Sequence, residues 1–159
     1  MNKGIVIATI ILALLIIAPI AYYLISPLFI VVEMNEDLPL GEKSISEISK
    51  ESILLRGNFV PSAHEATGDA ILIEGNGKKI LRFEDFEVLN GPDLHVWLVP
   101  DLNFPEDDYI DLGRLKATKG NINYEISEEI DFEKYDKVII WCVPFKVLFG
   151  YADLNQKSL

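Results

Sequence analysis

The residue best suited to chemistry is Cys142, the only cysteine in this chain of 159 residues. A thiol can ligate a soft metal or haem iron, change its oxidation state, or pack as a small hydrophobe. Cys142 lies in the segment VIIWCVPF at residues 138–145, where both alternating sets of side chains are apolar. Such a strand is typically covered on both faces, so we expect a buried thiol. Burial raises the pKa of a thiol and hinders its attack on substrates, which disfavours a cysteine hydrolase.

The two histidines are the other candidate ligands. His64 lies in PSAHEATG at residues 61–68, whereas His95 shares one face of a predicted strand with Trp97. We take His64 as the candidate metal or haem ligand beside Cys142, and we expect His95 to be a half-exposed surface residue. The acidic run at residues 105–111 lacks the fixed spacing of a calcium loop, so we predict a solvated connection there. A purely structural role remains open for Cys142 and for both histidines.

Several motifs of common enzymes are absent from the sequence. There is no GxSxG, no HExxH, no glycine-rich phosphate loop, no CxxC and no CxxCH. These absences exclude the corresponding hydrolases, metalloproteases and phosphate-binding loops, together with covalent attachment of c-type haem. The chain is therefore closer in character to an electron-transfer or binding domain than to an enzyme with turnover.

The N-terminal region predicts a membrane anchor. Residues 4–32 carry no charged side chain, which is enough length for a transmembrane helix. Lys3 precedes this run and Glu33 follows it, so the positive-inside rule predicts a single-pass protein of the cell membrane with its N-terminus inside. We assign residues 1–32 to an uncleaved signal anchor. A cleaved signal peptide is the alternative interpretation.

The rest of the chain is acidic and is expected to lie outside the membrane. The net charge of the whole protein is −11 at pH 7, which repels nucleic acid, so we exclude nucleic-acid binding. Residues 33–51 are polar, acidic at their start and interrupted by Pro39 and Gly41, which indicates an acidic stalk. Residues 52–159 form the outer domain.

The sequence pattern of the outer domain predicts an all-β fold. It contains eight short apolar runs with the length of strands, at residues 53–60, 70–73, 79–83, 94–99, 109–115, 122–126, 137–143 and 147–151. GNG at 75–77 and NGPD at 90–93 have the composition of tight turns. We predict a single β-sandwich or flattened barrel of about eight strands, preceded by one N-terminal transmembrane helix.

A set of motifs in the outer domain resembles the DM thirteen domain family. The matching residues are GNF at 57–59, HEATG at 64–68, LRF at 81–83, DF at 85–86, NGPDL at 90–94, DLG at 111–113, LK at 115–116, Gly120, Tyr124, and VIIWC at 138–142 followed by Phe145, Phe149, Ala152 and Leu154. The resemblance covers about residues 52–154. The NGPDL turn, the DLG motif and the segment around Cys142 are specific in combination.

The resemblance implies a β-rich extracytoplasmic domain with a role in electron transfer. The characteristic cysteine of the family matches Cys142, and its histidine matches His64. Such a site implies haem or a metal ion as the cofactor. It also implies a redox partner protein. Seven further residues belong to the shared motifs, namely Asn90, Gly91, Pro92, Asp93, Asp111, Gly113 and Trp141.

Three hypotheses follow. The first, which we favour, is a membrane-anchored redox module centred on Cys142, with His64 as the second candidate residue. The second is a noncatalytic module that binds a protein or glycan at the cell surface through residues 90–93 and an exposed Trp97. The third is a structural domain in which Cys142 is only packed.

Overall fold

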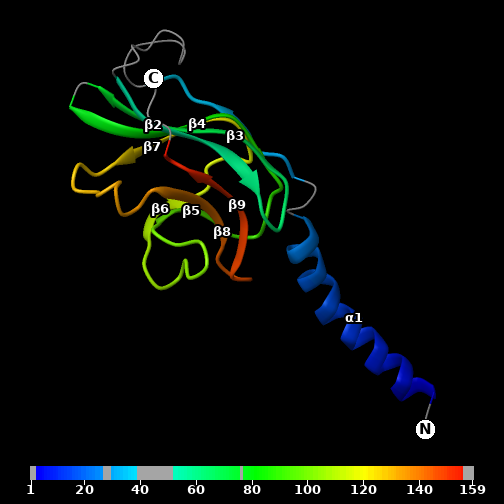
Figure 1. The fold of residues 1–159 in the computed structure, drawn as a ribbon. Helices are drawn as coiled ribbons and strands as arrows, with labels where there is room; N and C mark the ends of the chain where they lie inside the picture. Colours follow the sequence, from blue (N-terminus) through cyan, green and yellow to red (C-terminus); the bar gives the residue numbers. More distant parts are fainter. Residues whose placement is uncertain (1–2, 27–29, 39–51, 76, 156–159) are drawn as a thin grey trace.

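The computed structural model describes residues 3–26, 30–38, 52–75 and 77–155. These residues form one helix and nine strands (Figure 1). The elements are α1 (Lys3–Ile25), β1 (Glu33–Asn35), β2 (Ile53–Pro61), β3 (Ala66–Gly75), β4 (Lys78–Val88), β5 (Leu94–Val99), β6 (Ile110–Arg114), β7 (Lys119–Ile126), β8 (Lys137–Cys142) and β9 (Val147–Asp153). Each of the eight predicted strands is therefore confirmed, and β1 is an addition.

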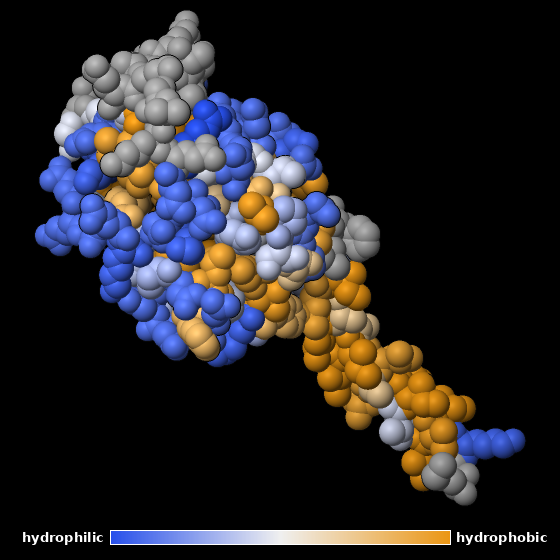
Figure 2. All heavy atoms as spheres, in the orientation of Figure 1, coloured by the Kyte–Doolittle hydropathy of each residue, from blue (hydrophilic) through white to orange (hydrophobic). Residues whose placement is uncertain are grey.

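Helix α1 is the only helix among the described residues that is long and apolar enough to cross a membrane. It has 23 residues, and none of them is buried against the rest of the protein. In Figure 1 it projects away from the β domain as a single rod, and Figure 2 shows an almost continuous apolar surface along it. These properties agree with the predicted membrane span, although an N-terminal signal sequence has the same length and composition.

The nine strands form one curled sheet in the order β1-β7-β4-β3-β2-β9-β8-β5-β6. Strand β2 makes the curl possible because its two halves have different partners. Its first half, from Ile53 to Asn58, pairs with β3, and its second half, from Phe59 to Pro61, pairs with β9. The sheet thus forms a half-barrel, which agrees with the predicted β fold (Figure 1).

The main core fills the inside of the curl. Phe59, at the bend of β2, lies 4.9 Å from Phe83 and 4.8 Å from Phe86, measured between ring centroids. Cys142 belongs to the same core. A second cluster covers the opposite face of β5 and β8 and includes Trp97 and Trp141. Strand β8 is therefore covered on both faces, as its composition predicts.

The start of the predicted stalk is part of the sheet. Glu33–Asn35 forms β1, which pairs in parallel with the beginning of β7. Gly120 permits this contact, because its φ is +108° and a Cβ atom there would lie 2.1 Å from the carbonyl oxygen of Met34. Leu38 is also buried, against Ile71 and Ile73. The remaining part of the expected stalk, residues 39–51, lies outside the described residues.

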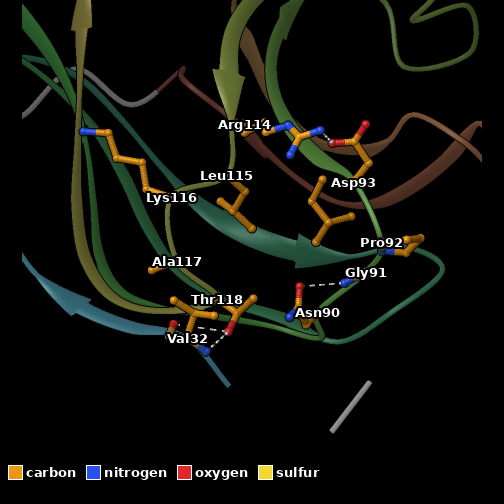
Figure 3. Close-up of a pocket in the computed structure, with 11 residues that line it drawn as sticks. Val32, Asn90, Gly91, Pro92, Asp93, Arg114, Leu115, Lys116, Ala117 and Thr118 are labelled. Atoms are coloured by element: carbon orange, nitrogen blue, oxygen red, sulfur yellow. Dashed lines mark hydrogen bonds and ion pairs between the residues drawn. The ribbon is translucent and has the colours of Figure 1, made fainter. Parts of the chain in front are cut away.

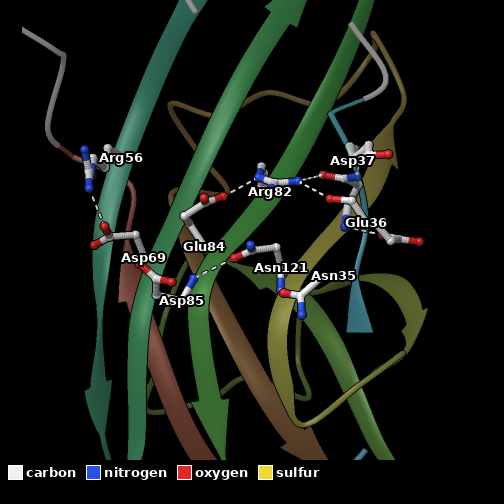
Figure 4. Close-up of polar contacts among 10 residues, drawn as sticks. Asn35, Glu36, Asp37, Arg56, Asp69, Arg82, Glu84, Asp85 and Asn121 are labelled. Atoms are coloured by element: carbon white, nitrogen blue, oxygen red, sulfur yellow. Dashed lines mark hydrogen bonds and ion pairs between the residues drawn. The ribbon is translucent and has the colours of Figure 1, made fainter. Parts of the chain in front are cut away.

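A buried arginine holds this N-terminal segment against the sheet (Figure 4). Arg82 is 3% exposed and forms an ion pair with Glu84. Its Nη1 donates to the carbonyl oxygen of Glu36 at 3.0 Å and to Oδ1 of Asn123 at 2.9 Å. Asn123 in turn donates from its side chain to the carbonyl oxygen of Asp37 at 2.8 Å. The polar residues after the helix are thus fixed by specific contacts, a feature that composition alone does not reveal.

Candidate functional site

Cys142 is the last residue of β8, and its side chain is fully buried. In the sheet it lies between Leu94 of β5 and Val147 of β9. Burial is the main cause that raises the pKa of the Cys142 thiol, and the carboxylate of Asp93 adds to the rise. Backbone hydrogen bonds from Phe145 and Asp93 act on the sulfur in the opposite direction. Cys142 is therefore a protonated thiol at neutral pH.

The NGPD turn at residues 90–93 packs directly against the end of β8. The carbonyl oxygen of Asp93 accepts a hydrogen bond from the backbone N–H of Val143 at 3.1 Å. Asn90 closes the turn, since its Oδ1 accepts from the N–H of Gly91 at 2.8 Å. Gly91 is tightly enclosed, because a Cβ atom there would lie 2.9 Å from the side chain of Leu94. Two motifs that are far apart in the sequence therefore meet at the sulfur of Cys142.

Asp93 also joins a polar cluster on the outside of the sheet. Its carboxylate lies 3.1 Å from Nη2 of Arg114 and 3.5 Å from Nε2 of His95. The other ring nitrogen of His95, Nδ1, lies 2.9 Å from the carboxylate of Asp111. Asp111 is fixed by the backbone N–H of Gly113, which donates to it at 2.8 Å. The NGPD and DLG motifs are thus connected through His95.

The sequence analysis did not single out His95 or Arg114 as site residues. The strand register brings these residues together, because His95 pairs with Arg114 and Trp97 pairs with Asp111. A single sequence shows alternation along β5 but does not show which residues of β6 lie opposite. The cluster could therefore be found only after the two strands had been paired.

Three cavities adjoin the NGPD turn, and one of them, of about 330 Å³, meets it only at Asn90. The other two are lined by most of the turn. The smaller, of about 140 Å³, lies between the turn and residues 114–118 (Figure 3). The larger, of about 480 Å³, is lined by the same turn and by Leu24, His64, Phe145, Val147 and Phe149. Cys142 is not among the residues that line either cavity.

His64 is placed by aromatic packing and by a backbone contact. Its ring lies 4.1 Å from that of Phe149, measured between centroids. Its backbone N–H donates to the carbonyl oxygen of Phe149 at 3.3 Å. His64 therefore faces a cavity, whereas Cys142 lies in the core behind Val147. The structure does not bring these two predicted residues to a common cavity.

Trp141 and Trp97 lie on the outer face of the sheet and are both buried, so the expectation that Trp97 is exposed is wrong. The rings of Trp97 and Trp141 stack at 5.3 Å between centroids, and Tyr109 stacks on Trp97 at 4.0 Å. Tyr109 comes just before β6 and covers the indole from outside. Sequence alternation assigns Trp97 correctly to the outer face, but it does not reveal that a connection folds over that face.

A protein-family comparison matches residues 58–154 to DM13, described as Electron transfer DM13. The match covers more than half of the chain and includes His64, the NGPD turn, the DLG motif and Cys142. This chain belongs to the DM13 electron-transfer domain family. Comparisons with curated proteins and with solved structures found no match. The DM13 domain of this protein is thus the curled sheet from the middle of β2 to the end of β9.

Proposed function

We propose that this protein is a membrane-anchored, extracytoplasmic electron-transfer domain in which the sulfur of Cys142 is the redox centre. The observation that supports it best is the position of Cys142, whose fully buried sulfur lies where the NGPD turn packs against the end of β8. The description of the family to which the chain belongs names electron transfer, which agrees with this assignment.

The buried position of the sulfur determines how it would exchange electrons. A charge inside an apolar core is costly, so loss of an electron and loss of the thiol proton are coupled. In the forward step Cys142 gives one electron to a strongly oxidising one-electron centre, a metal or a radical, in a partner protein and gives its proton to solvent, leaving a neutral sulfur radical. The reverse step returns one electron and one proton and restores the thiol. Asp93 lies between the sulfur and the outer cluster, because its carbonyl oxygen accepts from the N–H of Val143, next to Cys142, and its carboxylate belongs to the outer cluster.

The proposed placement rests on α1 and its flanks. Lys3 lies at the N-terminal end of the helix, and Glu33 and Glu36 follow its other end. An uncleaved helix with this charge asymmetry keeps its N-terminus inside and exposes the β domain outside. The domain then meets a redox partner at the outer surface of the cell membrane.

Cys142 and His64 do not form the joint haem or metal site that the family resemblance raised. Among the described residues, no group of three or more His, Cys, Asp or Glu side chains is placed to hold a metal ion. His64 lines the larger cavity and Cys142 does not, so the two do not form a common ligand set. The acidic run at residues 105–111 forms no such group either. We therefore assign the redox step to the sulfur itself.

The test is electron exchange by the full chain in phospholipid membranes, measured by voltammetry. Wild-type protein is expected to give a reversible signal that Cys142→Ser lacks. Val143→Ala is the matched control, because Val143 is the neighbouring residue and is partly exposed. Circular dichroism establishes that both variants are folded. A signal of equal size in folded Cys142→Ser would refute the proposal.

The alternative function is a noncatalytic module that binds a protein or glycan at the cell surface. The observation in its favour is the cavity of about 480 Å³ beside the NGPD turn, since ligand sites are typically concave and mostly apolar. In that case Cys142→Ser leaves every biological activity of the folded protein intact, whereas a change at Pro92 abolishes partner binding.

A further inference from the structure

The β domain is joined to α1 by a very short connection. Four residues separate Ile25, the last residue of the helix, from Ile30, and the five Cα–Cα steps between these two residues span at most about 18 Å. The carbonyl oxygen of Ile30 accepts a hydrogen bond from Nδ2 of Asn90 at 3.1 Å. The carbonyl oxygen of Val32 accepts from the backbone N–H of Thr118 at 2.8 Å. The domain is thus attached at residues 30–32 and is held close to the end of the helix.

The attachment point lies at one end of the half-barrel, which we call the tether end. It comprises residues 30–32, 61–65, 89–93, 115–118 and 143–146. Backbone hydrogen bonds tie these segments together, from Val88 to Thr118 at 2.9 Å and from Val143 to Asp93 at 3.1 Å. The β3–β4 hairpin and residues 127–136 lie at the opposite end of the strands.

The tether end carries most of the exposed apolar side chains of the β domain. Among the described residues outside α1, the exposed large hydrophobic residues are Ile30, Val31, Val32, Val60, Leu89, Phe104, Tyr109, Val143 and Phe145. All of them except Phe104 and Tyr109 lie at or next to the tether end. Phe145, at the tip of the β8–β9 turn, is 53% exposed. Figure 2 shows apolar surface continuing from the helix onto the adjoining part of the domain.

The opposite end of the half-barrel is acidic. Glu128, Glu129, Asp131 and Glu133 are all exposed in the connection between β7 and β8. Because carboxylates are repelled by anionic headgroups and strongly hydrated, this end is suited to water. The exposed apolar side chains therefore gather at the tether end, which also carries Glu65 and the Lys146–Glu106 ion pair, whereas the opposite end is acidic.

We propose that the tether end rests on the outer surface of the bilayer that α1 spans, with Phe145, Val143 and Leu89 in the interfacial layer. This inference rests on the membrane anchoring in the proposed function. The occupant of the apolar end is the lipid bilayer, because the short connection leaves this end no more than a few residues from the point where α1 leaves the membrane. Aromatic and aliphatic side chains at the end of an attached domain are suited to the headgroup boundary.

The larger cavity lies between the anchor and this end. Leu24 of α1 lines it from one side, and Phe145, Val147 and Phe149 line it from the other. Since Cys142 is only three residues from Phe145, the seated domain holds its sulfur near the membrane surface. A redox partner would therefore approach Cys142 from the membrane side or along the bilayer.

The test compares two labelled variants of the full chain in phosphatidylcholine vesicles. Phe145→Cys and Glu129→Cys each receive an environment-sensitive fluorophore, and both positions are exposed, so folding is preserved. The wild-type chain, labelled in parallel, corrects for any reaction of the buried Cys142. We expect blue-shifted emission at position 145, with quenching by spin-labelled lipid, and neither effect at position 129.

Three results would overturn the inference. The first is emission typical of water at both positions, and the second is equal lipid quenching at both. The third is a blue shift at position 145 without lipid quenching, which would mean that a protein, such as a second copy of this chain, covers the tether end. Alkaline washing of the vesicles tests the anchor separately. If alkaline washing removes the chain from the vesicles, membrane anchoring itself is refuted. If the chain stays but position 145 emits as in water, only the proposal that the tether end rests on the bilayer is refuted.

Discussion

At the scale of single residues, Cys142 combines two properties that pull its pKa in opposite directions. Burial stabilises the neutral thiol, and the backbone donors of Phe145 and Asp93 stabilise the thiolate. The net effect is a raised pKa, so the sulfur is a poor nucleophile in the folded protein.

The raised pKa predicts how stability changes at high pH. Below the ordinary thiol pKa of about 8.5, the thiol is neutral in both the folded and unfolded states. Above that pH the unfolded chain ionises first, so the contribution of Cys142 to stability is lost as pH rises toward the folded pKa. Urea unfolding of the β domain should show this loss in wild-type protein.

The matched variant is Cys142→Ala, which removes the titrating group. At neutral pH it should cost about 1 to 3 kcal/mol through lost packing. The deficit relative to wild type should then shrink at alkaline pH. A deficit that stays constant from neutral to alkaline pH would show that the thiol pKa is not raised by folding.

At the scale of elements, the eight strands after residue 52 could be predicted because their apolar runs and turn residues are local signals. The alternation in β5 and β8 also predicts correctly which face of each strand carries Val96 or Cys142. β1 was missed because EMN has no strand signal and pairs through backbone contacts that need Gly120. The cluster around His95 was missed for a different reason, because a single sequence does not show the register that places Asp111 and Arg114 of β6 beside His95.

Arg82 gives a test of how the N-terminal segment is held. Arg82→Ala should destabilise the protein by about 3 kcal/mol, because it removes a buried charge that pairs with Glu84 and hydrogen-bonds to the carbonyl oxygen of Glu36. The matched control is Arg56→Ala, since Arg56 pairs with Asp69 but its side chain is 41% exposed. That variant should lose less than about 1 kcal/mol. Chemical denaturation measures the free energy of unfolding of both variants. Equal losses would contradict the conclusion that Arg82 holds the N-terminal segment against the sheet.

Two glycines with similar φ angles separate backbone strain from β1 pairing. Gly120 and Gly113 have φ values of +108° and +101°, but only at Gly120 would a Cβ atom meet the carbonyl oxygen of Met34. Gly113→Ala should therefore show strain alone, about 1 to 3 kcal/mol. Gly120→Ala should lose more and should also speed hydrogen exchange at the amides of residues 33–36. Unchanged exchange in folded Gly120→Ala would show that the close approach does not hold β1 in place.

At the scale of the whole molecule, a long apolar helix and an acidic half-barrel are joined within a few residues. The sequence predicts both parts, because one is set by length and hydropathy and the other by short strands and turns. It does not predict which end of the barrel faces the helix, since that depends on contacts such as Asn90 with Ile30. That arrangement places the NGPD turn and Cys142 at the end of the half-barrel that adjoins the helix.

The central claim is that the sulfur of Cys142 carries the electron, and that its proton moves with it. The direct measurement is the midpoint potential of the full chain in membranes between about pH 6 and pH 8, where the thiol is protonated. One proton per electron predicts a potential that falls by about 59 mV for each pH unit. A potential that does not change with pH, or a redox signal that persists in Cys142→Ser, would contradict the account.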